Sequence, residues 1–171
     1  MKILVISDSH GRNDDVERVI SQVKNFDVLI HLGDIERGDD FIRSLVSCPT
    51  YMVLGNNDYR LDLPSEQIVQ IEGYRFFLTH GHRYYVNRGN MYLEGYAREH
   101  EIDVVLHGHT HVPTLFQEDG LTIACPGSIS YPRQSNRKQT FLCIEIDREG
   151  KIYFSFGYLE SELEKIYADL F

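Results

Sequence analysis

Histidine, aspartate and asparagine side chains gather in short polar clusters, and each cluster follows an apolar, strand-like run. The clusters are SDSHGR at 7–12, HLGDIE at 31–36, GNND at 55–58, THGH at 79–82 and HGHTH at 107–111. Of the 8 histidines in the chain, only His100 lies outside them. Imidazole, carboxylate and amide groups without thiolates suit divalent cations such as Mn²⁺, Mg²⁺, Fe²⁺, Ni²⁺ or Zn²⁺. The clusters therefore predict a metal site.

Seven side chains in these clusters are candidate metal donors. They are Asp8, His10, Asp34, Asn56, His80, His109 and His111. Asp34 follows a glycine, and its two carboxylate oxygens can bridge two cations. If Asp34 is shared, the seven donors give four ligands to each of two ions and leave positions for water and substrate. His31 and His107 end strands just before glycines, and we expect them to pack or to support the donors.

The elements around the first three clusters alternate between strand and helix. Strands are predicted at 2–7, 27–33 and 50–55, with helices at 14–23 and 39–47 between them. The first strand is an almost continuous apolar run, as in strands buried on both faces. This alternation predicts right-handed crossovers and a parallel sheet. Open α/β sheets of this kind build their sites where the strands end.

The second half of the chain follows a different pattern, which predicts another sheet. A hairpin over 67–81 turns at Glu72–Gly73, and a helix covers 91–102. Further strands are predicted at 103–111, 121–128, 139–147 and 151–159, and a closing helix at 161–171. The whole pattern is a mixed α/β domain that spans 1–171.

Composition and charge exclude several classes of protein. The chain has 171 residues, of which 42% are hydrophobic, and no run approaches the roughly 18 apolar residues of a membrane helix. The start of the chain is predicted to be a strand and not a signal peptide. Three cysteines without paired spacing indicate reduced, buried thiols and a cytoplasmic protein. A net charge of -9 argues against general nucleic-acid binding, although a cation-loaded site can still attract a phosphate.

The order of the motifs resembles the calcineurin-like metallophosphoesterase superfamily. That order is Asp-x-His, Gly-Asp, Gly-Asn-x-Asp, His and Gly-His-x-His. The opening KILVISDSHG and CPGSISYPR at 125–133 are similar to the small YfcE-like phosphodiesterase subfamily. The resemblance covers essentially the whole chain. It implies an α/β fold, a four-layer α/β/β/α sandwich of two mixed sheets flanked by helices.

The resemblance also implies a dinuclear metal site and a reaction. Two divalent ions would bind per chain, with Mn²⁺ the expected metal. Asp34 would bridge a first ion held by Asp8, His10 and His111 and a second held by Asn56, His80 and His109. A hydroxide that bridges the ions would attack the phosphorus of a small phosphodiester in line with the leaving group. Relatives of this size often form homodimers or larger homo-oligomers.

Two other functions remain open. One is a scaffold protein on the same fold, like the retromer subunit that resembles this family but has weakened metal-site chemistry. The other is a phosphomonoesterase that acts on a small metabolite. A complete set of donors favours catalysis over the scaffold, and paired diester and monoester substrates separate the two enzymatic alternatives.

Asn57 stands where many members of the superfamily have a histidine that assists the leaving group, with Asp58 to orient it. Asparagine cannot donate a proton as an acid. Either the leaving group needs no proton, or another residue supplies it, and His82 is the candidate. We expect Asp58 to support the loop in this chain.

The remaining candidates are substrate contacts. Arg12, Asn57, Ser128 and Arg133 could reach the phosphate, and a guanidinium suits that geometry. Ser128 and Arg133 lie in a loop punctuated by Gly127 and Pro132, so an ordinary turn role is an equal alternative for both.

Overall fold

Two stacked β-sheets form the centre of the molecule. The computed structural model describes residues 1–160. Each sheet has five strands, in the orders β10-β9-β1-β2-β3 and β4-β5-β6-β8-β7. The strands of the first sheet are β1 (Lys2–Ile6), β2 (Val28–His31), β3 (Thr50–Met52), β9 (Thr140–Ile146) and β10 (Ile152–Tyr158). Those of the second are β4 (Glu66–Ile71), β5 (Tyr74–Thr79), β6 (Val104–Leu106), β7 (Pro113–Glu118) and β8 (Leu121–Pro126).

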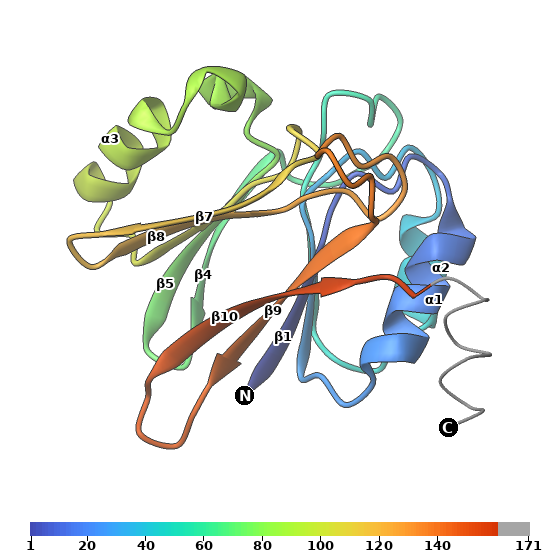
Figure 1. The fold of residues 1–171 in the computed structure, drawn as a ribbon, viewed down its shortest axis with the longest axis horizontal. Helices are drawn as coiled ribbons and strands as arrows, with labels where there is room; N and C mark the ends of the chain where they lie inside the picture. Colours follow the sequence, from blue (N-terminus) through green and yellow to red (C-terminus); the bar gives the residue numbers. More distant parts are fainter. Residues whose placement is uncertain (161–171) are drawn as a thin grey trace.

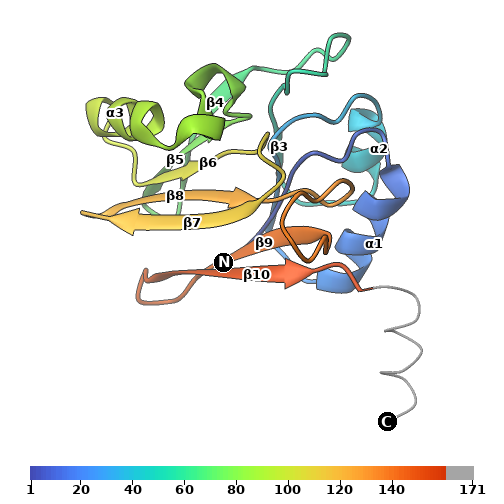
Figure 2. The same cartoon turned by 45° about the horizontal axis from the view of Figure 1, so that its top comes forward.

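Helices cover the outer face of each sheet. Helices α1 (Asn13–Val23) and α2 (Asp39–Ser44) pack on the first sheet, and α3 (Met91–Glu99) packs on the second (Figure 1, Figure 2). Two short 3₁₀ helices, η1 (His82–Tyr84) and η2 (Val86–Arg88), precede α3. The arrangement is the four-layer sandwich of two mixed sheets that the resemblance implied, and that prediction is confirmed.

The alternation of side chains along the strands explains the layers. In β1, Ile3 and Val5 enter the core between the two sheets, whereas Leu4 and Ile6 enter the core beneath α1 and α2. In β5, Phe77 belongs to a third core beneath α3. Because successive side chains of a strand point to opposite faces, a strand between two layers must be apolar at every position.

The strand directions bring several loops to one edge of the sandwich. β1, β2 and β3 run parallel to one another in the first sheet. In the second sheet β5, β6 and β8 do the same. The carboxyl ends of parallel strands lie at the same edge of a sheet, so the loops after them become neighbours. Figure 1 shows these loops converging at one end of the molecule.

The elements agree with the sequence predictions except at a few places. The hairpin between β4 and β5 turns at Glu72–Gly73, as predicted. The edge strand β7 was not predicted. The predicted helix at 161–171 lies outside the described residues.

All three cysteines are free, but only Cys125 is fully buried. Within residues 1–160, no helix is long and apolar enough to cross a membrane.

Candidate metal centre

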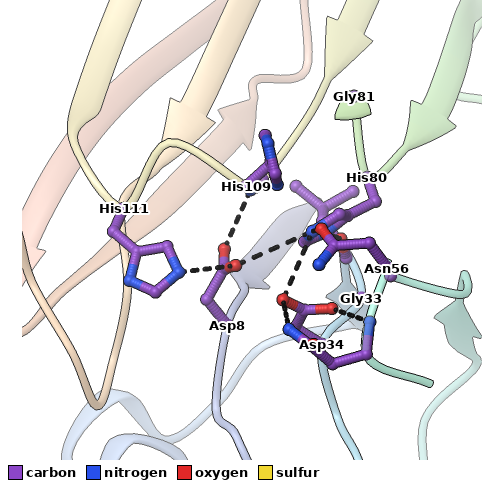
Figure 3. A network of polar contacts seen from close by, with 12 residues as sticks. Asp8, Gly33, Asp34, Asn56, His80, Gly81, His109 and His111 are labelled. Atoms are coloured by element: carbon purple, nitrogen blue, oxygen red, sulfur yellow. Dashed lines mark hydrogen bonds and ion pairs between the residues drawn. The ribbon is translucent and has the colours of Figure 1, made fainter. Parts of the chain in front are cut away.

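The seven candidate donors follow strands of both sheets, and Figure 3 shows six of them, all but His10, gathered around one point. Loops after β1, β2 and β3 supply four of them, and loops after β5 and β6 supply three. In chain order they are Asp8, His10, Asp34, Asn56, His80, His109 and His111. The fold therefore brings together side chains that are separated by up to 103 positions in the chain, from 8 to 111.

A first group of donors has the compactness of a metal site. One ligand atom from each of Asp8, His10, Asp34 and His111 lies within 4.8 Å of the others. Nε2 of His111 is 3.1 Å from Oδ1 of Asp8 and 3.3 Å from Nε2 of His10. Nε2 of His10 is 3.7 Å from Oδ2 of Asp34. Two carboxylates and two imidazoles thus face one point.

A second group of donors also contacts Asp34. Nε2 of His80 is 3.2 Å from Oδ1 of Asn56 and 3.5 Å from Oδ2 of Asp34. The rings of His80 and His109 are 5.2 Å apart between centroids. The backbone N–H of His109 also donates to Oδ2 of Asp8 across 3.1 Å. Asp34 is therefore common to both groups.

Hydrogen bonds behind the histidines aim their rings. Three of them bond a neighbouring oxygen through Nδ1 and keep Nε2 for the cluster: His10 to Glu36 (2.8 Å), His80 to the carbonyl of Leu32 (2.7 Å) and His111 to the carbonyl of Tyr131 (2.6 Å). Metal-binding histidines usually have such an outer partner, which fixes the tautomer and the orientation of the ring. This pattern fits a metal centre better than a buried ion-pair network.

The charges of the cluster also suit a cation. Burial raises the pKa of Asp8, but contact with His111 and the charge of His80 outweigh it, and the pKa lies below its usual value. The pKa of Asp34 is likewise lowered, because His80 and the N–H groups of Asn57 outweigh burial. Oδ1 of Asp8 is buried and receives no hydrogen bond from the described residues. Two ionised carboxylates with an unfilled acceptor provide the negative charge that divalent ions require.

The backbone at the donors is strained. Asp8, His10, Asp34, His109 and His111 all have positive φ angles, between 48° and 70°. This region is unfavourable for residues with a Cβ and persists only where the surrounding structure imposes it. Here each turn directs a donor side chain toward the cluster directly after its strand has ended.

Asn57 and Asp58 hold the loop after β3. Both N–H groups of Asn57, backbone and side chain, donate to the carboxylate of Asp34. Asp58 accepts hydrogen bonds from the backbone N–H groups of Glu36 and Gly55. These contacts favour the loop-supporting role expected for Asp58, and they engage the amide of Asn57 with Asp34.

The other predicted site residues have unequal access to the cluster. His82 is half-buried, with its ring 5.4 Å from that of His80. Ser128 is fully buried and donates to the carbonyl of Asp8 across 2.8 Å, which favours its turn role. Arg12 is exposed and pairs with Asp15 across 2.7 Å. Arg133 lines a pocket that begins at His10 and His111.

Three residues at the site were not predicted from the sequence. Glu36 is the outer partner of His10, and its place in the HLGDIE cluster was the available signal. Asn87, on η2, lies with Nδ2 2.9 Å from Nε2 of His109. Tyr131 contributes its backbone carbonyl to His111 and its ring edge to His10. Neither belongs to a polar cluster, although Tyr131 lies in the CPGSISYPR motif at 125–133, and the sequence carried no signal for Asn87.

Known proteins share both the sequence pattern and the fold. Residues 1–149 match the model of the calcineurin-like phosphoesterase superfamily domain. The phosphodiesterase YfcE of Escherichia coli is 27% identical over 166 residues, covering 80% of this chain and 83% of YfcE. A predicted phosphoesterase from Streptococcus pneumoniae superposes with a TM-score of 0.76 at 30% identity, covering 92% of this chain and 97% of the other.

A fourth similarity concerns the fold alone. Vps29 from Entamoeba histolytica, solved in complex with Zn²⁺, has a TM-score of 0.72 at 19% identity, covering 94% of this chain and all of Vps29. Because the family model matches residues 1–149, which are most of the chain, this chain belongs to the calcineurin-like phosphoesterase superfamily.

Proposed function

We propose that this chain is a metal-dependent phosphodiesterase that holds two divalent ions, with Mn²⁺ preferred. The observation that carries the proposal is the completeness of the donor set. All seven positions hold a donor of the required type. Asp8, His10, Asp34 and His111 lie close enough together to hold an ion, and His80, next to Asn56, also contacts Asp34. The name of the relative YfcE supports a diester as the substrate.

The residues of the chain would do three things in the reaction. Asp8, His10 and His111 would hold one ion, and Asn56, His80 and His109 the other, with Asp34 between them. Bound divalent ions lower the pKa of water and neutralise charge on a phosphate. Asn57 would keep the carboxylate of Asp34 in place through its two N–H groups. Arg133, at the mouth of the site, would attract the anionic substrate.

The protonation state of His82 decides whether this residue can donate a proton to the leaving group. Burial lowers the pKa of His82 to about 4, helped by the charges of His80 and His109. A ring that is neutral at pH 7 is a poor proton donor, which argues against His82 as the acid. We therefore propose that the natural leaving group departs without a proton. If so, Asn57→His should raise the rate on phenyl diesters, whose leaving group is poor, more than on nitrophenyl diesters.

Hydrolysis of bis-p-nitrophenyl phosphate by metal-stripped protein tests the function. Mn²⁺, Ni²⁺, Mg²⁺, Fe²⁺ and Zn²⁺ are added back in turn, and p-nitrophenyl phosphate is run in parallel as the monoester. We expect metal-dependent turnover of the diester that Asp34→Ala abolishes. Asp119→Ala, an exposed carboxylate in the loop after β7, is the matched control and should keep full activity.

Other outcomes would favour the alternatives. Faster turnover of the monoester would indicate a phosphomonoesterase for a small metabolite. No turnover with any metal, from folded protein that binds Mn²⁺ by calorimetry, would favour a binding or scaffold protein. The cytoplasmic location and a homo-oligomeric state remain predictions.

A further inference from the structure

A pocket of about 680 Å³ opens beside the first donor group. His10 and His111 line it on the side of the donors, together with residues of the loop between β8 and β9. Its lining residues from that loop are Ser130, Tyr131, Pro132, Arg133 and Arg137. A volume of this order accommodates a small organic group, and it exceeds what a single phosphate fills.

Two guanidinium groups of the pocket lack an acidic partner. Among residues 1–160, no carboxylate forms an ion pair with Arg133 or Arg137. Glu36 also lines the pocket, but its carboxylate is 2.8 Å from Nδ1 of His10. Other arginines of the described residues also form no ion pair, so the feature that distinguishes Arg133 and Arg137 is their place in one pocket beside the donor cluster. Positive charge is thus available in the pocket for a ligand.

The loop holds both arginines beside the cluster. The backbone N–H of Arg133 donates to the carbonyl of His111 across 3.0 Å, which joins this loop to the donor loop. Nη1 of Arg137 donates to the carbonyl of Pro132 across 3.0 Å, so the guanidinium lies folded over its own loop. A guanidinium that is already positioned loses less conformational freedom when it binds an oxyanion.

Tyr131 adds a flat surface to the same wall. Half of its area is exposed (50%), and its ring stands edge-on to that of His10, with centroids 5.4 Å apart. The guanidinium of Arg12 lies 5.9 Å from the ring centroid. An aromatic face flanked by arginines suits a planar group that carries an anion.

We propose that this pocket binds a second phosphate of the substrate, so that the preferred diester carries a phosphate monoester group besides the scissile phosphate. The inference rests on the proposed function, because it takes the scissile phosphate to lie at the donor cluster. A diester phosphate has a single charge, which two divalent ions would already neutralise. Two arginines in this pocket would then exceed what attraction of the scissile phosphate needs, unless a further anion lies beside His10 and His111. The guanidinium fork matches the oxygens of a phosphate monoester.

A matched pair of diesters tests the proposal. Thymidine 5′-(p-nitrophenyl phosphate) and its 3′-phosphorylated form differ only in the second phosphate. With the Mn²⁺-loaded protein, we expect a KM about tenfold lower for the phosphorylated form, the lower end of the effect of one hydrogen bond to a charged group. Arg137→Gln should bring the ratio of the two KM values close to one. Arg98→Gln, an exposed arginine on α3 that pairs with Asp119, is the control and should retain the ratio.

Equal KM values for the two diesters in the unmodified protein would overturn the proposal. So would a full preference in Arg137→Gln, or an equal loss in Arg98→Gln, which would indicate long-range attraction only. Calorimetric titration with thymidine 3′,5′-bisphosphate and thymidine 5′-phosphate separates this proposal from the proposed function. Tighter binding of the bisphosphate that depends on Arg137 supports the pocket even if neither diester is hydrolysed. Equal affinities for the two nucleotides would reject the pocket even if both diesters are hydrolysed.

Discussion

Asn57 binds both carboxylate oxygens of Asp34, through its backbone N–H to Oδ1 across 2.8 Å and through its side-chain amide to Oδ2 across 2.7 Å. Two donors from one residue prevent the carboxylate from rotating. This restraint matters because Asp34 is the donor that the two groups share. The residue that occupies the position of the family's histidine therefore has a positioning role toward Asp34.

Removing the side-chain donor should weaken metal binding. Asn57→Leu keeps the size of the side chain and the backbone N–H but loses the amide. We expect the affinity for Mn²⁺, measured by calorimetry, to fall about 10- to 100-fold, as for other outer partners of metal ligands. Asn57→His restores an N–H group and should recover part of the loss. An Asn57→Leu variant with unchanged affinity would show that the backbone bond alone holds Asp34.

The sequence was informative wherever a donor directly follows a parallel strand. The ends of β1, β2, β5 and β6 could be located from apolar runs, and parallel strands must end at a common edge. Asp8 and Asp34 were therefore predictable as neighbours, whereas only the family resemblance brought His80 and His109 to the same site. The family resemblance added how the donors divide between two ions, which spacing could not provide.

Features that depend on backbone groups or on irregular segments could not be predicted. Tyr131 contributes a carbonyl to His111, and any residue has a carbonyl. Asn87 lies on a 3₁₀ helix of three residues, too short for a periodic pattern. The edge strand β7 is mostly exposed and mixes polar and apolar residues, so it lacks the apolar run that marks the buried strands.

Two glycine substitutions should change stability in opposite directions. A Cβ at Gly108 would overlap Oγ of Ser7 and lie 2.9 Å from Oδ2 of Asp8. A Cβ at Gly95, within α3, would meet nothing within 4 Å. We expect Gly108→Ala to lower the free energy of unfolding by about 1–3 kcal/mol through overpacking. Gly95→Ala should raise it by about 1 kcal/mol, because alanine favours helix.

Urea unfolding of metal-free protein measures both effects, and Mn²⁺ titration adds a second test. Gly108→Ala should also weaken Mn²⁺ binding, since the added methyl group displaces Asp8, whereas Gly95→Ala should not. A Gly108→Ala variant with unchanged stability and affinity would show that the loop after β6 can move away without cost.

Stability of the metal-free protein should fall in mild acid because of His31. His31 is fully buried, with Nε2 2.9 Å from Oγ of Ser9. Burial lowers the pKa of His31 to about 4. The unfolded chain binds a proton at this residue below about pH 6.5, whereas the folded chain does so only below about pH 4. The free energy of unfolding therefore falls as the pH drops through this window, by up to about 1.4 kcal/mol per pH unit.

His31→Gln isolates this contribution. Glutamine can donate to Ser9 and accept from the backbone N–H of Gly33, as His31 does, but it does not titrate. The free energy of unfolding is measured with urea at pH 7, 6 and 5. It should depend less steeply on pH in His31→Gln, because about one proton fewer is taken up on unfolding. Burial also lowers the pKa values of His82 and His107 to about 4, and their contribution to the same pH window is common to both proteins. Identical slopes would mean that His31 is protonated within the folded protein.

Asn87 should set the affinity of the second donor group through His109. Its side-chain amide lies 2.9 Å from Nε2 of His109, so Nδ1 is the nitrogen left to bind a metal. When Nδ1 binds a cation, Nε2 carries the proton, and the amide can rotate to present its oxygen as acceptor. Asn87→Leu removes that acceptor and should lower the affinity for one Mn²⁺ ion about tenfold. Asn87→Asp keeps an acceptor and should bind Mn²⁺ at least as tightly as the unmodified protein.

Asn136→Leu, on the loop between β8 and β9, controls for the loss of an exposed amide. Calorimetry that shows equal affinity in Asn87→Leu and Asn136→Leu would mean that His109 needs no partner on η2.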